Sequence, residues 1–220
     1  MKKALSVLGL LAGLAYSGIA NAQSYTSSNA NTSLTNIPTS LTPQLEKAKE
    51  AFYEKIVKTE VEKSAKDDSY FILIDKTDRK LYLYNNGQLD TVFSVGLSGW
   101  GGLEEKIKEG DGRTPEGKFK VGEKNPDSDY LRSLKINYPL RRDAERGLRE
   151  RLISKRVYEG IISKHDSENM PSQKTNLGGN ICIHGGGSWD WTDGCVALND
   201  EDIEYLYALV DLGTPVVIRK

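Results

Sequence analysis

The sequence is poor in cysteine and histidine and has almost no excess charge. Only two of its 220 residues are Cys and two are His, and 30 basic side chains nearly balance 31 acidic ones. This balance argues against a nucleic-acid-binding protein, which normally displays a basic face or stripe. Because Cys182 and Cys195 are close in sequence, a disulfide between them would close only a short loop and would be a weak staple.

Long apolar runs are missing after the first 22 residues, so no later stretch is expected to span a bilayer. Residues 1–22 have the pattern of a secretory signal: Lys2 and Lys3, an apolar stretch from Ala4 to Ala15, and the small-residue sequence Ala20-Asn21-Ala22. Glycines interrupt the stretch, which argues against a membrane anchor, and no Cys follows directly to receive a lipid. We therefore expect cleavage after Ala22 and a mature protein in the periplasm that is not inserted in the membrane.

The rest of the chain is expected to form a leader and one domain. Residues 23–41 are dominated by Ser, Thr, Asn and Gln, a composition typical of a flexible segment. Thr42 and Pro43 then begin a predicted helix with one apolar stripe that runs to about Lys66. The predicted organisation is a signal segment over 1–22, a leader with an amphipathic helix over 23–66, and a catalytic domain over 67–220.

Strand patterns dominate the predicted domain. Residues rich in β-branched and aromatic side chains predict strands at Tyr70–Asp75, Lys80–Tyr84 and Gln88–Val95, and Asn86-Gly87 predicts a hairpin turn and an antiparallel meander. Further expected elements are a strand over Lys118–Gly122, a loop and strand between Asp127 and Pro139, a helix over about Arg141–Ser167, a helix capped by Asn199 and ended by Gly213, and a closing strand over Thr214–Arg219. The fold class is therefore mixed and β-rich, with flanking helices and an N-terminal helical extension.

The chemistry-bearing segment runs from Ile181 to Leu198. A short apolar strand ends at His184, a Gly-rich loop follows, and Cys195 stands before the next strand. A thiol becomes a useful nucleophile when a neighbouring imidazole takes its proton, because the thiolate is the reactive form. Gly194 allows a tight turn in which the amides of Asp193, Gly194 and Cys195 would face a developing oxyanion.

These residues resemble the L,D-transpeptidase (YkuD-type) catalytic domain. Its signature is His-Gly, a variable loop and Ser/Thr-x-Gly-Cys, with an upstream segment matched by Arg113-Thr114-Pro115-Glu116-Gly117-Lys118-Phe119, and the likeness covers about residues 67–219. The resemblance implies a β-sandwich or barrel-like domain that cleaves peptidoglycan stem peptides at the bond between a diamino acid and D-alanine. It implies no metal or other cofactor.

The same resemblance assigns roles to particular residues. Cys195 becomes the nucleophile, His184 the general base, and Gly185 the source of a backbone carbonyl that orients the imidazole. Substrate contacts are expected from the four residues around the two motifs, Arg113, Trp189, Trp191 and Thr192, although the two tryptophans would equally serve to staple the loop.

Several alternatives stay open. Ala197 stands where many family members have Arg, and this Gly-Cys-Val-Ala variant resembles a branch with hydrolytic members, so the acceptor is a stem amine, a protein lysine, a D-amino acid or water. A wall-binding protein without turnover is a further possibility. Cys182 is either a spectator or a disulfide partner of Cys195, and a zinc site at Cys182, His184 and Cys195 is disfavoured because only three ligands are evident.

Overall fold

A computed structural model of the protein describes residues 42–220. The expected signal segment over 1–22 and flexible segment over 23–41 lie outside the described residues. The chain divides into two units, Met1–Lys55 and Ile56–Lys220, with the boundary inside helix α2 (Thr42–Asp67). This helix corresponds to the one expected between Thr42 and about Lys66. Within the described residues, no helix is long and apolar enough to cross a membrane.

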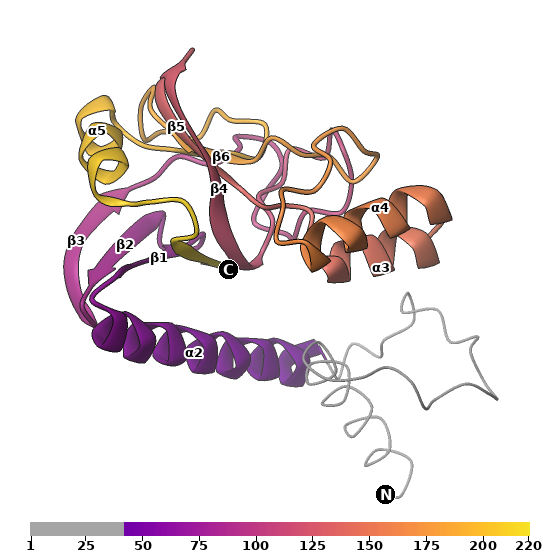
Figure 1. The fold of residues 1–220 in the computed structure, drawn as a ribbon, viewed down its shortest axis with the longest axis horizontal. Helices are drawn as coiled ribbons and strands as arrows, with labels where there is room; N and C mark the ends of the chain where they lie inside the picture. The colour runs from indigo at the N-terminus through magenta and orange to yellow at the C-terminus, as the bar shows by residue number, and fades with distance from the viewer. Residues whose placement is uncertain (1–41) are drawn as a thin grey trace, which may run out of the picture. The chain divides into compact units, whose positions relative to one another are not determined.

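The second unit is built on one eight-stranded sheet with the order β3-β2-β1-β8-β4-β5-β6-β7 (Figure 1). The strands are β1 (Tyr70–Asp75), β2 (Lys80–Asn85), β3 (Gln88–Ser94), β4 (Gly117–Ser128), β5 (Leu131–Ile136), β6 (Cys182–His184), β7 (Val196–Ala197) and β8 (Pro215–Arg219). The helices of this unit after α2 are α3 (Arg141–Arg149), α4 (Lys155–Asp166) and α5 (Asp200–Leu209). The β-rich fold class expected from the sequence is confirmed.

The predicted meander is confirmed by the pairing of β1, β2 and β3. Both pairs are antiparallel, and the turn residues Asn86 and Gly87 have φ values of 49° and 74°, as a two-residue hairpin requires. The turn is held against the end of α2, because Ser64 Oγ accepts the Gly87 amide at 3.0 Å. The last strand, β8, then inserts between β1 and β4, parallel to the former and antiparallel to the latter.

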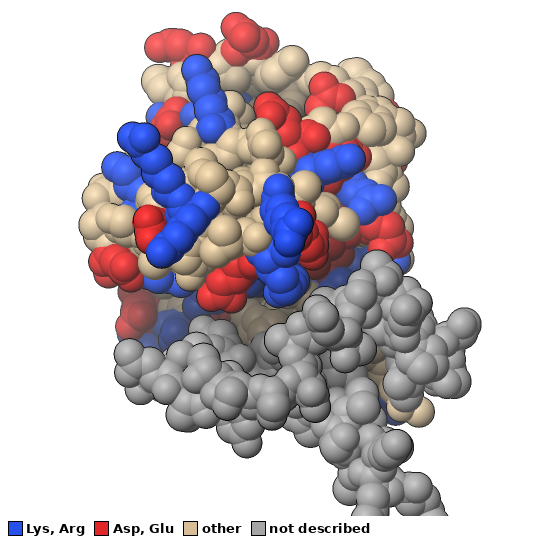
Figure 2. All heavy atoms as spheres, turned by 90° about the vertical axis from the view of Figure 1, so that its right-hand side faces the viewer, with Lys and Arg blue, Asp and Glu red and all other residues tan. Residues whose placement is uncertain are grey.

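The main hydrophobic core lies along this sheet. It contains fully buried side chains from both ends of the domain, such as Ile72, Leu83, Val121, Ile183 and Ile218. Apolar residues on alternating positions of the strands supply it, which is why the sequence pattern found most strands. The face seen in Figure 2 mixes basic and acidic side chains.

Two segments differ from the sequence expectation in the middle of the chain. The strand expected over Lys118–Gly122 is longer, because the polar residues up to Ser128 pair with β5 and form a long hairpin. The helix expected over about Arg141–Ser167 is two helices, α3 and α4. The second helix is capped by Ser154, whose hydroxyl accepts the Val157 amide at 3.3 Å. The helical periodicity of the sequence did not indicate this break.

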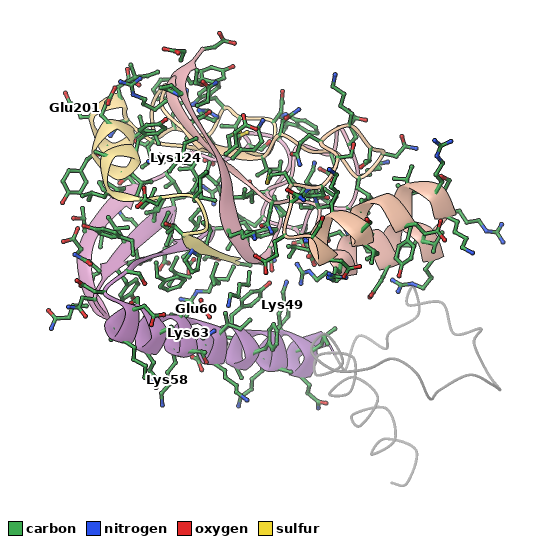
Figure 3. All side chains as sticks on the ribbon, viewed as in Figure 1. Lys49, Lys58, Glu60, Lys63, Lys124 and Glu201 are labelled. Carbon is green, nitrogen blue, oxygen red and sulfur yellow. The ribbon has the colours of Figure 1, made fainter. Side chains whose placement is uncertain are left out.

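The last helix also ends earlier than expected. Helix α5 stops at Leu209, and Gly213 lies in the following turn with φ 91°. Lys124 of β4 fixes this end of the helix, because its Nζ donates to the carbonyls of Tyr207 at 2.8 Å and Val210 at 2.6 Å (Lys124 is labelled in Figure 3). A cation at a helix C-terminus is favourable, since the last carbonyls have no partner within the helix.

Candidate active site

The site forms where two short parallel strands bring distant residues together. Strand β6 ends at His184 and β7 begins directly after Cys195, and the register pairs Ile183 with Val196 and His184 with Ala197. Cys182 and His184 leave β6 on the same face because they are two residues apart. The thiol of Cys195 therefore lies beside both of these side chains.

The Cys195 sulfur has several partners. It accepts the backbone amide of Cys182 at 3.4 Å, and its thiol also reaches the carbonyl of Asn180 at 3.4 Å. The side chains of Cys182 and His184 both form hydrogen bonds with it, and these two contacts lower the pKa of Cys195 well below its ordinary value although burial opposes the shift. The same contact with Cys195, together with burial, raises the pKa of Cys182. Of the two thiols, Cys195 is thus the one whose ionisation is favoured.

The imidazole of His184 is buried, with 4% of its surface exposed, and its orientation is fixed. Its Nδ1 lies 2.7 Å from the carbonyl oxygen of Gly185, which leaves Nε2 for the thiol. Burial alone would lower the pKa of His184, but the bonds to Cys195 and to Gly185 outweigh it and raise that pKa. A lowered thiol pKa beside a raised imidazole pKa favours a thiolate–imidazolium pair.

Aromatic rings enclose the imidazole on its other sides. Tyr130, at the turn between β4 and β5, stacks on His184 with ring centroids 4.6 Å apart and an interplanar angle of 26°. Trp191 meets the same imidazole edge-on at 5.5 Å. The Tyr130 carbonyl also accepts the Gly185 amide at 3.1 Å, so the hairpin turn holds both the ring and the backbone of this segment. Sequence reasoning missed Tyr130, because nothing in the pattern connects a hairpin turn with His184.

Thr192 holds the turn that presents the nucleophile. Its hydroxyl donates to the carbonyl of Cys195 at 2.8 Å and accepts the amide of Gly194 at 3.3 Å. Thr192 is 3% exposed and positions this turn, and the substrate contact expected from the sequence stays a prediction. The Gly194 amide donates to Thr192 within the turn, whereas the amide of Cys195 has no partner within residues 42–220. The oxyanion contribution expected from Gly194 stays a prediction.

The upstream motif lies directly against this turn. Gly194 has φ 121°, and a Cβ added there would lie 2.6 Å from the carbonyl oxygen of Arg113, so only glycine fits. The side chain of Arg113 donates to the carbonyl of Glu105 at 3.4 Å. The structure thus brings the two sequence motifs together through the Arg113 backbone.

The loop that carries Arg113 is held in place by the buried Lys76–Glu116 ion pair and by the carboxylate of Asp111. Lys76 lies 2.9 Å from Glu116, and its Nζ donates to the carbonyls of Leu103 at 2.7 Å and Thr114 at 3.2 Å. Asp111 accepts the Arg113 amide at 3.0 Å and the Lys106 ammonium at 2.8 Å. Burial raises the pKa of Asp111, but these hydrogen bonds outweigh it and lower that pKa overall.

Two exposed tryptophans lie at the rim of the thiol site. Trp189 is 63% exposed and packs its ring over Gly187, while Trp100 is 61% exposed and donates its Nε1 to Asp193 at 3.2 Å. Asp190 anchors the segment between them, because it accepts the Leu97 amide at 2.8 Å and pairs with Arg79 at 2.8 Å. The sequence pattern singled out Trp189 but neither its neighbour Asp190 nor Trp100, which comes from a separate loop.

Residues 42–220 contain no cluster of three or more His, Cys, Asp or Glu arranged to hold a metal ion. A hollow of about 310 Å³ elsewhere on the second unit is lined by residues that include Glu60, Lys63 and Lys118 and does not include the thiol. Glu60 there pairs with Lys118 at 2.6 Å (Glu60 and Lys63 are labelled in Figure 3). The Cys195–His184 arrangement is therefore the candidate site on chemical grounds.

Comparisons with known proteins identify the domain. The family model described as the YkuD L,D-transpeptidase catalytic domain matches residues 69–218. Among solved structures, the helical cell shape determining protein Pgp2 from Campylobacter jejuni is 24% identical, with 69% of this chain and 48% of that chain covered and a TM-score of 0.46. An L,D-transpeptidase from Xylanimonas cellulosilytica is 13% identical, with 69% and 61% covered and a TM-score of 0.41.

This chain matches only part of each of these structures. The chain spans 61% of the Xylanimonas chain and 48% of the Campylobacter chain. A comparison with curated protein sequences finds no match.

Proposed function

The chain belongs to the L,D-transpeptidase (YkuD) catalytic domain family, and on that premise we propose that it is a Cys195-dependent enzyme acting on peptidoglycan stem peptides. The observation that supports this most is the contact of the Cys195 thiol with His184, whose Nδ1 is held by the Gly185 carbonyl. Such an arrangement matches a nucleophile, a base and a group that orients the base.

The proposed reaction proceeds in two acyl transfers. The Cys195 thiolate attacks the carbonyl carbon of the third residue of the stem, a diamino acid, and the amide of Cys195 donates to the oxyanion. The C–N bond to the terminal D-alanine breaks, His184 gives its proton to the leaving amine, and a thioester on Cys195 remains. An acceptor amine then loses a proton to His184 and attacks the thioester, and the C–S bond breaks to regenerate the Cys195 thiolate beside the protonated His184.

Transfer to an amine is the primary proposal, and hydrolysis is the second candidate. The observation that favours hydrolysis is Ala197, which is fully buried and replaces the Arg that follows Gly-Cys-x in many family members. An Arg binds a carboxylate through two parallel hydrogen bonds, which alanine cannot supply. Loss of that group removes one means of holding a peptide acceptor, and water needs no such contact.

The decisive experiment is product analysis with defined tetrapeptide muropeptides. The mature chain is incubated with them and the products are identified by mass spectrometry, with Cys195→Ala as the matched control. Dimers joined through two third-position residues, or exchanged terminal D-amino acids, support the transferase. Shortened stems without a new bond support the hydrolase, and products that persist in Cys195→Ala contradict both.

We also propose that the protein acts in the periplasm. The support is the charged start, apolar stretch and Ala20-Asn21-Ala22 pattern of residues 1–22. Cell fractionation followed by N-terminal sequencing tests this, with Ala20→Leu and Ala22→Leu substitutions as variants that should block cleavage. A chain that keeps Met1 and stays in the cytoplasm would contradict the proposal.

A further inference from the structure

The proposed acyl transfer uses one thiol, yet two thiols meet at the site. Cys182 forms a side-chain hydrogen bond with Cys195, and its backbone amide donates to the same sulfur at 3.4 Å. Neither step of the transfer needs a group at this position, because His184 supplies the base. The second thiol therefore calls for an explanation of its own.

The strand register favours a covalent bond between the two cysteines. Because β6 and β7 are parallel and Ile183 pairs with Val196, Cys182 and Cys195 occupy the preceding position of the same register. Neighbouring strands lie about 4.8 Å apart, and disulfides join residues whose Cα atoms are roughly 4.4–6.8 Å apart. Both cysteines are free thiols in the structure, and both are partly exposed. The register therefore places the two cysteines at a separation that a disulfide can bridge with little backbone movement.

The electronic environment of Cys195 makes it the thiol that reacts first. His184 and the two donors of Cys182 stabilise its thiolate, and they lower the pKa of Cys195. Thiolates that are stabilised and accessible are the ones that peroxides oxidise. The neighbouring Cys182, which remains protonated because its pKa is raised, lies within hydrogen-bonding contact of the oxidised sulfur.

We propose that Cys182 is a resolving cysteine, which closes a reversible disulfide with Cys195 when the active-site thiol is oxidised by a peroxide. The Cys195 thiolate attacks one peroxide oxygen, the O–O bond breaks, and hydroxide leaves with a sulfenic acid formed on Cys195. The sulfur of Cys182 then attacks that sulfenic sulfur, loses its proton to the departing hydroxyl, and releases water. The two thiols together lose two electrons, and the peroxide is reduced.

The consequence is protection of the nucleophile. A sulfenic acid without a nearby thiol is oxidised further to sulfinic and sulfonic acids, which thiol reductants do not reverse. The disulfide stops at the reversible stage and silences the site until a dithiol reduces it.

The test compares wild type with Cys182→Ser and Cys182→Ala after exposure of the mature chain to hydrogen peroxide. Free thiols are then blocked with iodoacetamide, and peptides are identified by mass spectrometry before and after dithiothreitol. The Ser variant keeps a hydroxyl donor next to Cys195, and circular dichroism establishes that each variant is folded. This readout follows the sulfur atoms themselves, so it remains informative if the proposed wall activity is wrong.

In wild type we expect a Cys182–Cys195 cross-linked peptide that has lost two hydrogen atoms, and dithiothreitol should return most of the chain to the dithiol. In both variants Cys195 should pass to sulfinic and sulfonic acid, with most of its alkylation lost permanently. The proposal is overturned if wild-type Cys195 is overoxidised while Cys182 stays free, or if the variants recover with dithiothreitol as fully as wild type. It is equally overturned if neither thiol of wild type changes under peroxide doses that oxidise free cysteine.

Discussion

Replacing Lys76 with methionine should destabilise the domain strongly, because it removes an ammonium group that lies against the buried Glu116 carboxylate. The two side chains are 2.9 Å apart and only 1% and 0% exposed. Lys76 also donates to the carbonyls of Leu103 and Thr114, which flank the loop that carries Arg113. Removing one member of a buried ion pair typically costs about 3–5 kcal/mol, because the remaining charge stays buried. We expect Lys76→Met to lower the free energy of unfolding by about that amount.

Urea unfolding followed by tryptophan fluorescence measures this loss, with a double-mutant cycle as the control. The double variant Lys76→Met/Glu116→Leu removes both charges and should be less destabilised than the sum of the two single variants by at least ~1 kcal/mol. Acylation of Cys195 by a carbapenem gives a second readout, since the loop anchored by Lys76 lies against the nucleophile turn. A free energy of unfolding for Lys76→Met within ~0.5 kcal/mol of wild type would refute the reasoning.

Three further predictions concern the thiol site. Thr192→Val should lower the free energy of unfolding by about 1–3 kcal/mol for each group left unpaired, and it should slow carbapenem acylation. Thr192→Ser keeps both hydrogen bonds of the hydroxyl and should match wild type in stability and acylation rate. Equal acylation rates in the two variants would contradict the role of Thr192 in positioning the turn. Tyr130→Ala should slow acylation roughly two- to tenfold, because a ring pair contributes ~0.5–1.5 kcal/mol, and Tyr130→Phe should not; a slow Phe variant would point to the hydroxyl instead. Because the pKa of Cys195 is lowered, iodoacetamide should still alkylate Cys195 at pH values well below ~8.5, the pKa of a free thiol. His184→Ala should raise the midpoint pH of alkylation towards that pKa, and an unchanged midpoint would contradict the influence of His184 on the thiol.

Much of this fold could be predicted because its information is local. The meander β1–β2–β3 follows from alternating apolar residues and the Asn86-Gly87 turn, and the core positions follow the same period. The middle of the chain was less predictable. The polar end of β4 is held by pairing with β5 rather than by a buried face, and the break between α3 and α4 depends on the cap at Ser154.

The site divides in the same way. Cys195, His184 and Gly185 stand in two short motifs, so their chemistry is visible in the sequence, and their contacts are present in the structure. The residues that support them come from elsewhere. Tyr130, from a hairpin turn, stacks on His184, and Lys76, which follows β1, holds the loop that packs against the Cys195 turn. Their contribution depends on the strand order, which no local pattern reports.

Asn199 shows how a correct position can carry a different interaction. It occupies the cap position of α5 as expected, but its side chain makes no bond to the helix amides. Its Oδ1 instead accepts the amide of Ser188 at 3.2 Å and the hydroxyl of the same residue at 3.0 Å, and so holds the Gly-rich loop. The sequence allows Asn199 either to cap the helix amides or to bond Ser188, and the tertiary structure favours the bonds to Ser188.

The most direct test of the account is the intact mass of the mature chain, quenched in acid shortly after mixing with a tetrapeptide muropeptide. We predict an adduct on Cys195 equal to the donor without its terminal D-alanine, which disappears in Cys195→Ala and builds up more slowly in His184→Ala. An adduct on another residue, or product release in Cys195→Ala at the wild-type rate, would contradict the central claim that Cys195 carries the acyl group.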